Sequence, residues 1–326
     1  MKAVQLTRYS ASLEGLACVD IDEPPPPGAG EVTIEIDASP IHPADLLSLT
    51  GSYASPLPLP LVPGGEATGR IVAVGPGVDA FAVGDRAMPL SRGNWVERRT
   101  VPVSDVIAVP NGDPLQLAML KVVPATAHLM LTSIVDLPEG CGVIQNAANS
   151  SVGLAAIRLA ERMGVTMINV VRREELIDDL VAYGASNAFL DDSDLEDHVR
   201  AAFGDGQIRL AIDAVAGEAS LRLSECLSPG GTMVNFGLLS GEPCMVRPYR
   251  TIFEGIKLTG FWVSKYIASA ERAELEALYA DLAKLVIDGV ISTPIEASYP
   301  IAEAMDAIRH AGGFRRSGKV MILPNG

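Results

Sequence analysis

The chain has 326 residues and a formal net charge of −15, with 48% hydrophobic and 20% charged residues. This composition is typical of a globular protein with one or two well-filled domains, and it excludes a disordered chain. The pI near 4.7 argues against a nucleic-acid or anionic-membrane surface, because both of these partners are polyanions. No apolar run approaches the roughly 18 residues of a membrane span, and the start, MKAVQLTRYS, does not resemble a signal peptide. We therefore expect a cytoplasmic protein.

The first third of the chain has the pattern of a β-rich module. Short β-branched runs such as KAVQL, EVTIEIDASP, GRIVAVG and DVIAVP alternate with turn clusters, and four prolines at 24–27 mark a connector. Closely spaced short strands of this kind favour a barrel or a sandwich. We assign residues 1–118 to this module.

From about residue 120 the pattern changes to alternating strands and helices. Apolar strands such as GVIQNA and TMINVVR alternate with amphipathic segments such as SSVGLAAIRLAERMG and REELIDDLVAYGA. This alternation predicts βαβ units in a parallel sheet that is covered on both faces. We assign residues 119–256 to this α/β domain and expect residues 257–326 to return to the first module.

The stretch QNAANSSVG, residues 145–153, lies where a dinucleotide-binding loop is expected. Only Gly153 remains of the usual G-x-G-x-x-G, with Ala148 and Ser150 at the first two glycine positions. Both replacements are small enough if the turn needs no positive φ, and the polar residues add donors at a helix N-terminus, where an anion is favoured. The alternative is an ordinary helix N-cap without a ligand. The residues predicted to contact the cofactor are Asn149, Ser150, Ser151, Val152 and Gly153.

Two arginines, Arg172 and Arg173, stand at the end of the second strand of this domain. A site for NAD usually has an Asp or Glu there, which accepts a hydrogen bond from the ribose 2′-hydroxyl. Arginine instead matches the 2′-phosphate of NADPH through charge-assisted hydrogen bonds. The alternative, a solvated basic pair, is less favourable because cations at a helix start oppose the helix dipole. The sequence therefore predicts NADPH as the cofactor.

These features together resemble the medium-chain dehydrogenases/reductases over essentially the whole chain. The segments that carry the resemblance are PGGEATGRIVAVGPGV, VGDR, PATAHLML and SPGGTMVNFG. The resemblance implies an α/β fold in which a GroES-like β-rich catalytic domain accompanies a doubly wound Rossmann sheet. Three further segments, VIQNAANSSVG, INVVR and GFWVS, are similar to the NADPH-dependent 2-enoyl thioester reductases of fatty-acid metabolism. Quinone oxidoreductases of the superfamily are the next most similar group.

The positions that bind zinc in the alcohol dehydrogenases of this superfamily are occupied differently here. His42 precedes Asp45, Gly65 precedes Glu66, and the lobe with four cysteines is missing. A catalytic zinc needs three protein ligands and one open position. We therefore expect no metal. The four cysteines are too scattered for a zinc site or a disulfide framework, and we expect buried free thiols at Cys18, Cys141, Cys226 and Cys244.

Without zinc, reduction of a carbonyl lacks its Lewis acid. Reduction of an activated carbon–carbon double bond has fewer requirements. A hydride is added to the β-carbon, a donor steadies the carbonyl oxygen, and a proton reaches the α-carbon. The resemblance implies that Tyr53, in the loop LTGSYASPLPLP, assists this protonation or orients the substrate. The enoyl reductases have Asn where this chain has His42, and His42 is either a donor near the substrate or a neutral packing replacement. A second departure is Ser151, where glycine is more common.

Two further site residues follow from the resemblance. Thr126 in PATAHLML matches a position near the nicotinamide ribose, and the alternative is a hydroxyl bonded to its own helix. Trp262 in GFWVS matches an aromatic residue near the substrate channel, and the alternative is a core tryptophan.

The sequence thus predicts a zinc-independent, NADPH-dependent reductase of a trans-2-enoyl thioester, carried on coenzyme A or acyl-carrier protein. The first alternative is an NADPH:quinone or enone oxidoreductase, and the second is an NADPH-binding protein without turnover. The expected partners are a small-molecule substrate and a second copy of the chain, with no nucleic acid and no membrane. The resemblance implies that such a homodimer joins Rossmann sheets edge to edge near TMVNFG.

Overall fold

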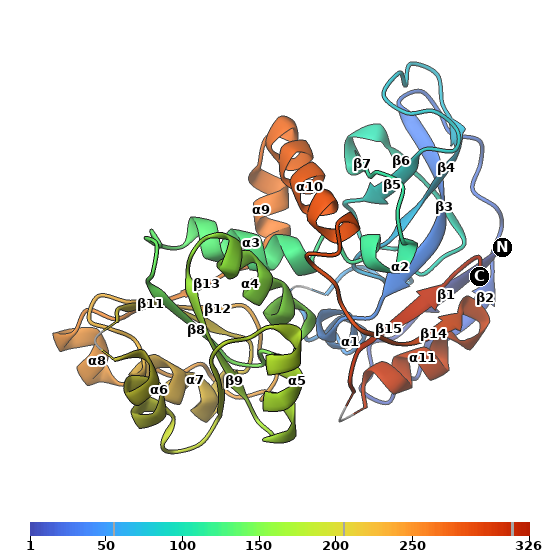
Figure 1. The fold of residues 1–326 in the computed structure, drawn as a ribbon. Helices are drawn as coiled ribbons and strands as arrows, with labels where there is room; N and C mark the ends of the chain where they lie inside the picture. The colour runs from blue at the N-terminus through green and yellow to red at the C-terminus, as the bar shows by residue number, and fades with distance from the viewer. Residues whose placement is uncertain (55, 205, 314–315) are drawn as a thin grey trace. The chain divides into compact units, whose positions relative to one another are not determined.

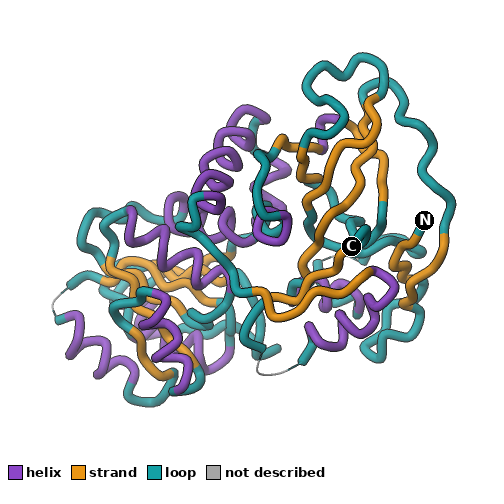
Figure 2. Tube along the Cα trace, turned by 45° about the vertical axis from the view of Figure 1, so that its right-hand side comes forward, coloured by secondary structure: helices purple, strands orange, loops and turns teal. Residues whose placement is uncertain are grey.

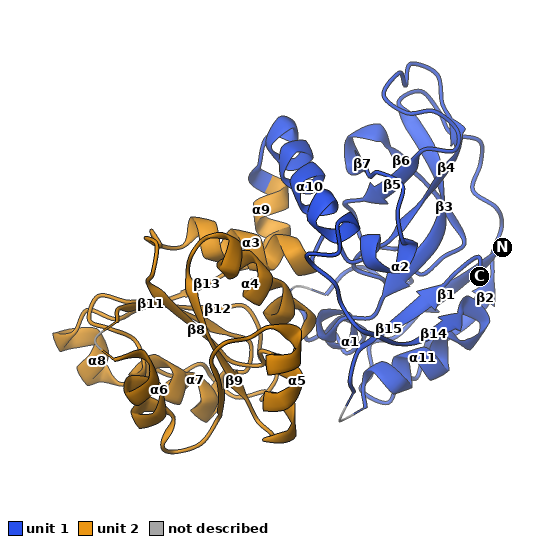
Figure 3. Ribbon diagram, in the orientation of Figure 1, with its two compact units in different colours: residues 1–122, 269–326 blue, residues 123–268 orange. Residues whose placement is uncertain are grey.

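The chain forms two compact units in a computed structural model that describes residues 1–54, 56–204, 206–313 and 316–326. Unit 1 contains residues 1–122 and 269–326, and unit 2 contains residues 123–268 (Figure 3). The last part of the chain thus returns to the module that the first third begins.

The boundaries of the units differ from the predicted ones at 118/119 and 256/257. Lys121 belongs to unit 1, because its buried ammonium donates to the main-chain carbonyls of Gly65 and Leu90. Residues 257–260 belong to unit 2, because they pair with residues 232–235 of the parallel sheet. The strand in LTGFWV was therefore wrongly expected to return to the first module.

Unit 1 is built on a seven-stranded sheet with a separate antiparallel pair, β1–β2. The strand order is β14-β15-β3-β4-β5-β7, and β6 pairs with β3. The pairs within this sheet are antiparallel except β14–β15. The strands are β1 (Lys2–Leu6), β2 (Leu16–Asp20), β3 (Glu31–Pro40), β4 (Thr68–Val74), β5 (Arg86–Pro89), β6 (Arg98–Pro102), β7 (Val106–Ala108), β14 (Ile295–Pro300) and β15 (Lys319–Leu323).

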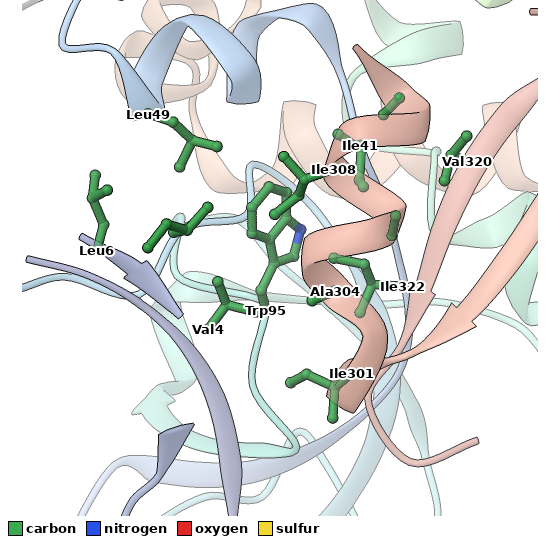
Figure 4. Packing of buried hydrophobic residues seen from close by; sticks show 13 residues of the cluster. Val4, Leu6, Ile41, Leu49, Trp95, Ile301, Ala304, Ile308, Val320 and Ile322 are labelled. Atoms are coloured by element: carbon green, nitrogen blue, oxygen red, sulfur yellow. The ribbon is translucent and has the colours of Figure 1, made fainter. Parts of the chain in front are cut away.

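Helices of unit 1 close its core against these strands. They are α1 (Pro43–Leu49), α2 (Pro114–Leu117), α10 (Arg272–Ile287) and α11 (Ala304–Ala311), with short 3₁₀ turns at Val103–Asp105 and Ile301–Glu303. Trp95 is fully buried among apolar side chains from β1, α1, α11 and β15 (Figure 4). Residues from both ends of the chain therefore share one hydrophobic core.

Unit 2 is a six-stranded parallel sheet with helices on both faces (Figures 1 and 2). Its strand order is β10-β9-β8-β11-β12-β13. The strands are β8 (Gly142–Gln145), β9 (Thr166–Val171), β10 (Ala188–Leu190), β11 (Ile208–Asp213), β12 (Thr232–Asn235) and β13 (Lys257–Gly260). The helices are α3 (Val123–Ser133), α4 (Ser151–Arg162), α5 (Glu175–Tyr183), α6 (Leu195–Phe203), α7 (Gly217–Glu225), α8 (Pro248–Phe253) and α9 (Val263–Ser269).

The strand order of unit 2 reverses between β8 and β11. From β8 the chain steps outward to β9 and β10, then crosses back to β11 and steps the other way. Right-handed crossovers therefore place α4 and α5 on one face and α6 and α7 on the other. In such doubly wound sheets a ligand binds at the carboxyl ends of the strands beside this reversal. The loop that follows β8 lies at that position.

β13 is one of the two outer strands of this sheet, and its four residues are exposed. The strand in TMVNFG is β12, which lies between β11 and β13, so the free sheet edge nearest to it is that of β13. Among the described residues, no helix is long and apolar enough to span a lipid bilayer.

Candidate active site

The loop QNAANSSVG connects β8 to α4 at the reversal of the strand order. Its turn does require a positive φ, which falls on Ala147 at 48°, one residue before the predicted first glycine position. A non-glycine residue in this region carries strain of about 1 kcal/mol. Ala148 itself is fully buried, and its N–H donates to the carbonyl of Val170 at 3.3 Å. The loop thus keeps the turn of a glycine motif without its first two glycines.

Gly153 lies where the start of α4 approaches the loop most closely. A Cβ atom placed on Gly153 would lie 2.5 Å from the carbonyl oxygen of Ala148 and 2.8 Å from two other main-chain atoms of that residue. No side chain fits at such distances. The remaining glycine is therefore required by close packing of helix and loop, which is the role of the third glycine in a dinucleotide-binding loop.

The N-terminus of α4 presents donors toward solvent. Ser150 is the N-cap residue, and its hydroxyl oxygen accepts from the N–H of Gly153 at 3.1 Å. The N–H groups of Ser151 and Val152 have no partner within the helix, because the first turn of a helix has none to offer. Asn149 is exposed beside them. This end of the helix is suited to bind an anion such as a pyrophosphate.

A buried amide pair, which no sequence motif indicated, fixes this helix start. Gln145, at the end of β8, donates to the carbonyl of Gly153 at 3.0 Å and to the side-chain oxygen of Asn169 at 2.8 Å. Asn169 lies on β9 and in turn donates to the carbonyl of Asn187 at 3.0 Å. Since these groups are buried and satisfied, they hold the first turn of α4 against the sheet.

A second buried group on this edge of the sheet was also missed. Asp213, at the end of β11, is fully buried and accepts from the side chains of Asn146 at 2.6 Å and Asn235 at 2.7 Å. It also accepts from the N–H groups of Val215 and Ala216, both at 3.0 Å. Asp213 thereby ties together the loops after β8, β11 and β12.

The two arginines after β9 differ in their surroundings. Arg172 is exposed, and no partner in the described part of the chain holds its guanidinium. Arg173 is half-buried, with its Nε 3.3 Å from the carboxylate of Glu175. Arg172 is thus the arginine that is available to a phosphate.

The other two predicted site residues of unit 2, Thr126 and Trp262, differ in how far they are exposed. Thr126 is buried in α3, with 4% of its surface exposed. Trp262 lies just before α9 with 46% of its surface exposed, so it is not a core tryptophan. The buried tryptophan of this protein is Trp95, in unit 1.

In unit 1, His42 is the N-cap residue of α1 and the centre of a buried polar cluster. Its main-chain N–H donates to Oδ2 of Asp45 at 2.9 Å, which stabilises the start of the helix. Its ring contacts Glu66 through Nε2, and the ammonium of Lys319 lies 3.1 Å from Nδ1. An ammonium can only donate, so Nδ1 accepts and Nε2 carries the proton that is shared with Glu66. Both ring nitrogens of His42 are therefore engaged inside the protein.

The charges of this cluster compensate one another away from water. Glu66 is fully buried, and its second oxygen accepts from the N–H of Val122 at 2.8 Å. Burial lowers the pKa of Lys319 to about 8, against the opposing attraction of Glu66. Burial lowers the pKa of Lys121 to about 8 in the same way. The Lys121 ammonium is held by main-chain carbonyls and that of Lys319 by the imidazole of His42, while the attraction of Glu66 opposes the lowering of both pKa values.

Tyr53 adjoins the same cluster through Arg92. The guanidinium of Arg92 lies 5.0 Å from the centre of the Tyr53 ring, a cation–π contact. It also donates to the hydroxyl of Ser48 at 2.6 Å and lies 3.6 Å from Oδ1 of Asp45. His42, Asp45, Arg92 and Tyr53 thus form a continuous series of contacts within unit 1.

Known proteins are similar to this chain in sequence and in fold. Residues 28–111 match the family model of the alcohol dehydrogenase GroES-like domain, and residues 151–284 match that of the zinc-binding dehydrogenase. The chain is 33% identical over 289 residues to a mitochondrial enoyl-[acyl-carrier-protein] reductase of Bos taurus, covering 86% of this chain and 78% of the relative. The chain belongs to the medium-chain dehydrogenase/reductase superfamily.

Solved structures of medium-chain dehydrogenases/reductases have the same fold. A quinone oxidoreductase of Escherichia coli, solved with NADPH, superposes with a TM-score of 0.88 at 23% identity, covering 99% of this chain and 100% of that one. The 2-enoyl thioester reductase of Candida tropicalis, in a complex with NADP and crotonyl-CoA, superposes with a TM-score of 0.88 at 22% identity, covering 99% of each chain. The predicted superfamily and its α/β fold are confirmed.

One of the matching family models is named for zinc, but the residues around His42 do not fit a zinc ion. The Lys319 ammonium lies 3.1 Å from one ring nitrogen, and the other nitrogen is bonded to a buried carboxylate. Across residues 1–54, 56–204, 206–313 and 316–326, no group of three or more His, Cys, Asp and Glu side chains is arranged to hold a metal. A catalytic zinc needs three such ligands.

Proposed function

We propose that this dehydrogenase/reductase reduces the double bond of trans-2-enoyl thioesters, carried on coenzyme A or acyl-carrier protein, with NADPH. The observation that carries the proposal is the similarity to the bovine enoyl-[acyl-carrier-protein] reductase, which extends over 86% of the chain at 33% identity. The fold is also that of a 2-enoyl thioester reductase solved with NADP and crotonyl-CoA.

The loop after β8 and the arginine after β9 are suited to NADPH. The close approach at Gly153 and the donors at the start of α4 support binding of a pyrophosphate by Asn149, Ser150, Ser151 and Val152. The exposed Arg172 supports a 2′-phosphate, whereas Arg173 already pairs with Glu175. We retain Thr126 as a contact of the nicotinamide ribose and Trp262 as a substrate contact. When bound, NADPH supplies the hydride for the β-carbon.

Tyr53 and the cluster around His42 serve the substrate in this proposal. Tyr53 assists protonation of the α-carbon or orients the thioester carbonyl. His42 orients this region rather than giving a proton to the substrate, because both of its ring nitrogens are bonded inside unit 1. No step requires a metal.

The experiment that tests the proposal is steady-state oxidation of NADPH with crotonyl-CoA and longer trans-2-enoyl-CoA substrates. We expect turnover that depends on chain length, with butyryl-CoA as the saturated control that gives none. No turnover at any chain length would overturn the enoyl thioester assignment.

A quinone or enone oxidoreductase is the second candidate. The observation in its favour is the TM-score of 0.88 to the quinone oxidoreductase of Escherichia coli. A panel that includes 1,4-naphthoquinone and simple enones separates the two activities by their kcat/KM ratios. Tight NADPH binding without turnover in any assay would instead identify a non-catalytic NADPH-binding protein.

We also propose that the protein is a homodimer joined at the edge of the unit 2 sheet. The exposed strand β13 offers unpaired main-chain groups, and its Leu258 is 47% exposed. Ile252 and Phe253, both in the preceding helix α8, are 69% and 74% exposed. Light scattering after gel filtration should give twice the mass of the 34.2 kDa chain, and Leu258→Lys should give the mass of one chain.

A further inference from the structure

Arg92 is the charged residue in contact with Tyr53, and neither the sequence motifs nor the proposed reaction gives it a role. Its side chain is 35% exposed, and its guanidinium lies 5.0 Å from the centre of the tyrosine ring. A cation over an aromatic face restricts the ring and interacts more strongly where water is partly excluded. Tyr53 is half-buried, which meets that condition.

Three groups from unit 1 hold Arg92 in this position. Ser48 accepts from its Nη2 at 2.6 Å, and the fully buried Asp45 lies 3.6 Å from the same nitrogen. The main-chain carbonyl of Arg92 accepts from Arg99 at 2.8 Å. Asp45 is itself fixed by the main-chain N–H of His42. The guanidinium of Arg92 is therefore bonded to residues of α1 and also contacts the ring of Tyr53.

The charge around Arg92 also favours a fixed position. Lys121, a buried cation, lies close enough for its pKa to be affected by Arg92, so the two charges repel each other. Asp45 is the carboxylate paired with Arg92. Attraction to Asp45, a residue of α1, therefore favours a position of the guanidinium beside that helix.

We propose that Arg92 is a positioning residue that acts through Tyr53, fixing the ring and the electrostatic environment of its phenol. The inference rests on the proposed function, because Tyr53 is the group that would act on the substrate. Arg92→Met removes the cation and keeps much of the stem, whereas Arg92→Lys keeps a cation. Ser48→Ala removes one hydrogen-bond acceptor of Arg92 and keeps the arginine itself.

The kinetic test is a double-mutant cycle between Arg92→Met and Tyr53→Phe, with crotonyl-CoA and NADPH. We expect Arg92→Met to lower kcat about five- to thirtyfold, which corresponds to 1 to 2 kcal/mol at 1.36 kcal/mol per factor of ten. Arg92→Lys should recover part of kcat, and Ser48→Ala should show a smaller loss. In the Tyr53→Phe background, Arg92→Met should cost less than twofold. Additive losses in the cycle would overturn the proposal.

A matched control exists in unit 2, where Arg158 lies 4.6 Å from the centre of the Tyr183 ring. Arg158→Met removes the same kind of contact outside the cluster and should leave kcat unchanged. Equal losses from Arg158→Met and Arg92→Met would show a general effect on stability and would contradict a role through Tyr53.

A readout without turnover separates this inference from the proposed function. In protein with ¹³Cζ-labelled tyrosine, the resonance absent from Tyr53→Phe is that of Tyr53. It should shift in Arg92→Met and Ser48→Ala and stay in place in Arg158→Met. A shift of this resonance without turnover of any trans-2-enoyl-CoA, short or long, would refute the proposed function and leave the contact established. An unchanged Tyr53 resonance would overturn the positioning role whatever the substrate.

Discussion

Replacement of Gly153 by alanine gives the sharpest test of how the cofactor loop is built. The new Cβ would lie 2.5 Å from the carbonyl oxygen of Ala148, whereas ordinary contact begins near 3.4 Å. The start of α4 would have to move by about 0.9 Å, the difference between these distances. Gln145 and Ser150 oppose that movement, because both are hydrogen-bonded to main-chain atoms of Gly153.

The cost of this substitution follows from close packing. Overpacking a well-ordered site typically costs about 1–3 kcal/mol of unfolding free energy. If the movement also breaks one charge-assisted hydrogen bond to a phosphate, the Kd for NADPH rises about ten- to a hundredfold. Urea unfolding followed by circular dichroism measures the first quantity, and NADPH fluorescence titration measures the second.

Gly312→Ala is the control for Gly153→Ala. Gly312 has a φ of −80°, and a Cβ there would meet its nearest atoms at 3.6 Å, so alanine fits. We expect its unfolding free energy to be unchanged or to rise by about 0.4–1 kcal/mol. If Gly153→Ala matched this control in both stability and NADPH affinity, the close-approach explanation of the remaining glycine would be wrong.

Four further substitutions test other parts of the structure. Arg172→Ala should weaken NADPH far more than NADH, and equal losses in titrations with both cofactors would remove the 2′-phosphate role. Tyr53→Phe should lower kcat in the enoyl-CoA assay with the Kd for NADPH little changed, and unchanged turnover would exclude Tyr53 from the reaction. Ala147→Gly should raise the unfolding free energy in urea by up to about 1 kcal/mol by relieving a φ of 48°, less the extra entropy of an unfolded glycine. Lys319 has a pKa lowered from 10.5 to about 8, so between these pH values the unfolded state binds more protons and this group makes stability rise with pH. Lys319→Met should lack that rise, worth roughly 3 kcal/mol, in urea unfolding compared with the wild type from pH 7.5 to 10.5.

Local sequence patterns were sufficient to predict the helices α4 and α5 of unit 2. The apolar spacing in SSVGLAAIRLAERMG predicted a helix, which the structure has as α4 at Ser151–Arg162. The amphipathic segment REELIDDLVAYGA likewise contains α5 at Glu175–Tyr183, and Gly184 within that segment caps the helix with a φ of 108°. Such features depend on residues a few positions apart, so periodicity and end signals report them directly.

The sequence could not show features that depend on the folded turn or on distant partners. The position of the positive φ at Ala147 is set by how β8 meets α4, and alanine carries no signal for it. The engagement of His42 by Lys319 joins residues 277 positions apart. The sequence therefore left two roles for His42 open, a donor near the substrate and a neutral packing replacement. The strand in LTGFWV was assigned to the wrong unit because a short apolar run does not indicate which sheet it joins.

The long sequence separation between His42 and Lys319 has a consequence for synthesis of the chain. His42 and Glu66 are made early, but the ammonium beside them is on the last strand, β15. At about 5–20 residues per second, translation takes on the order of 10 to 50 seconds to pass from Glu66 to Lys319. During that time unit 2, which is continuous from 123 to 268, is complete on the ribosome. Unit 2 of a nascent chain is therefore ready to fold before the cluster around His42 has all of its charges.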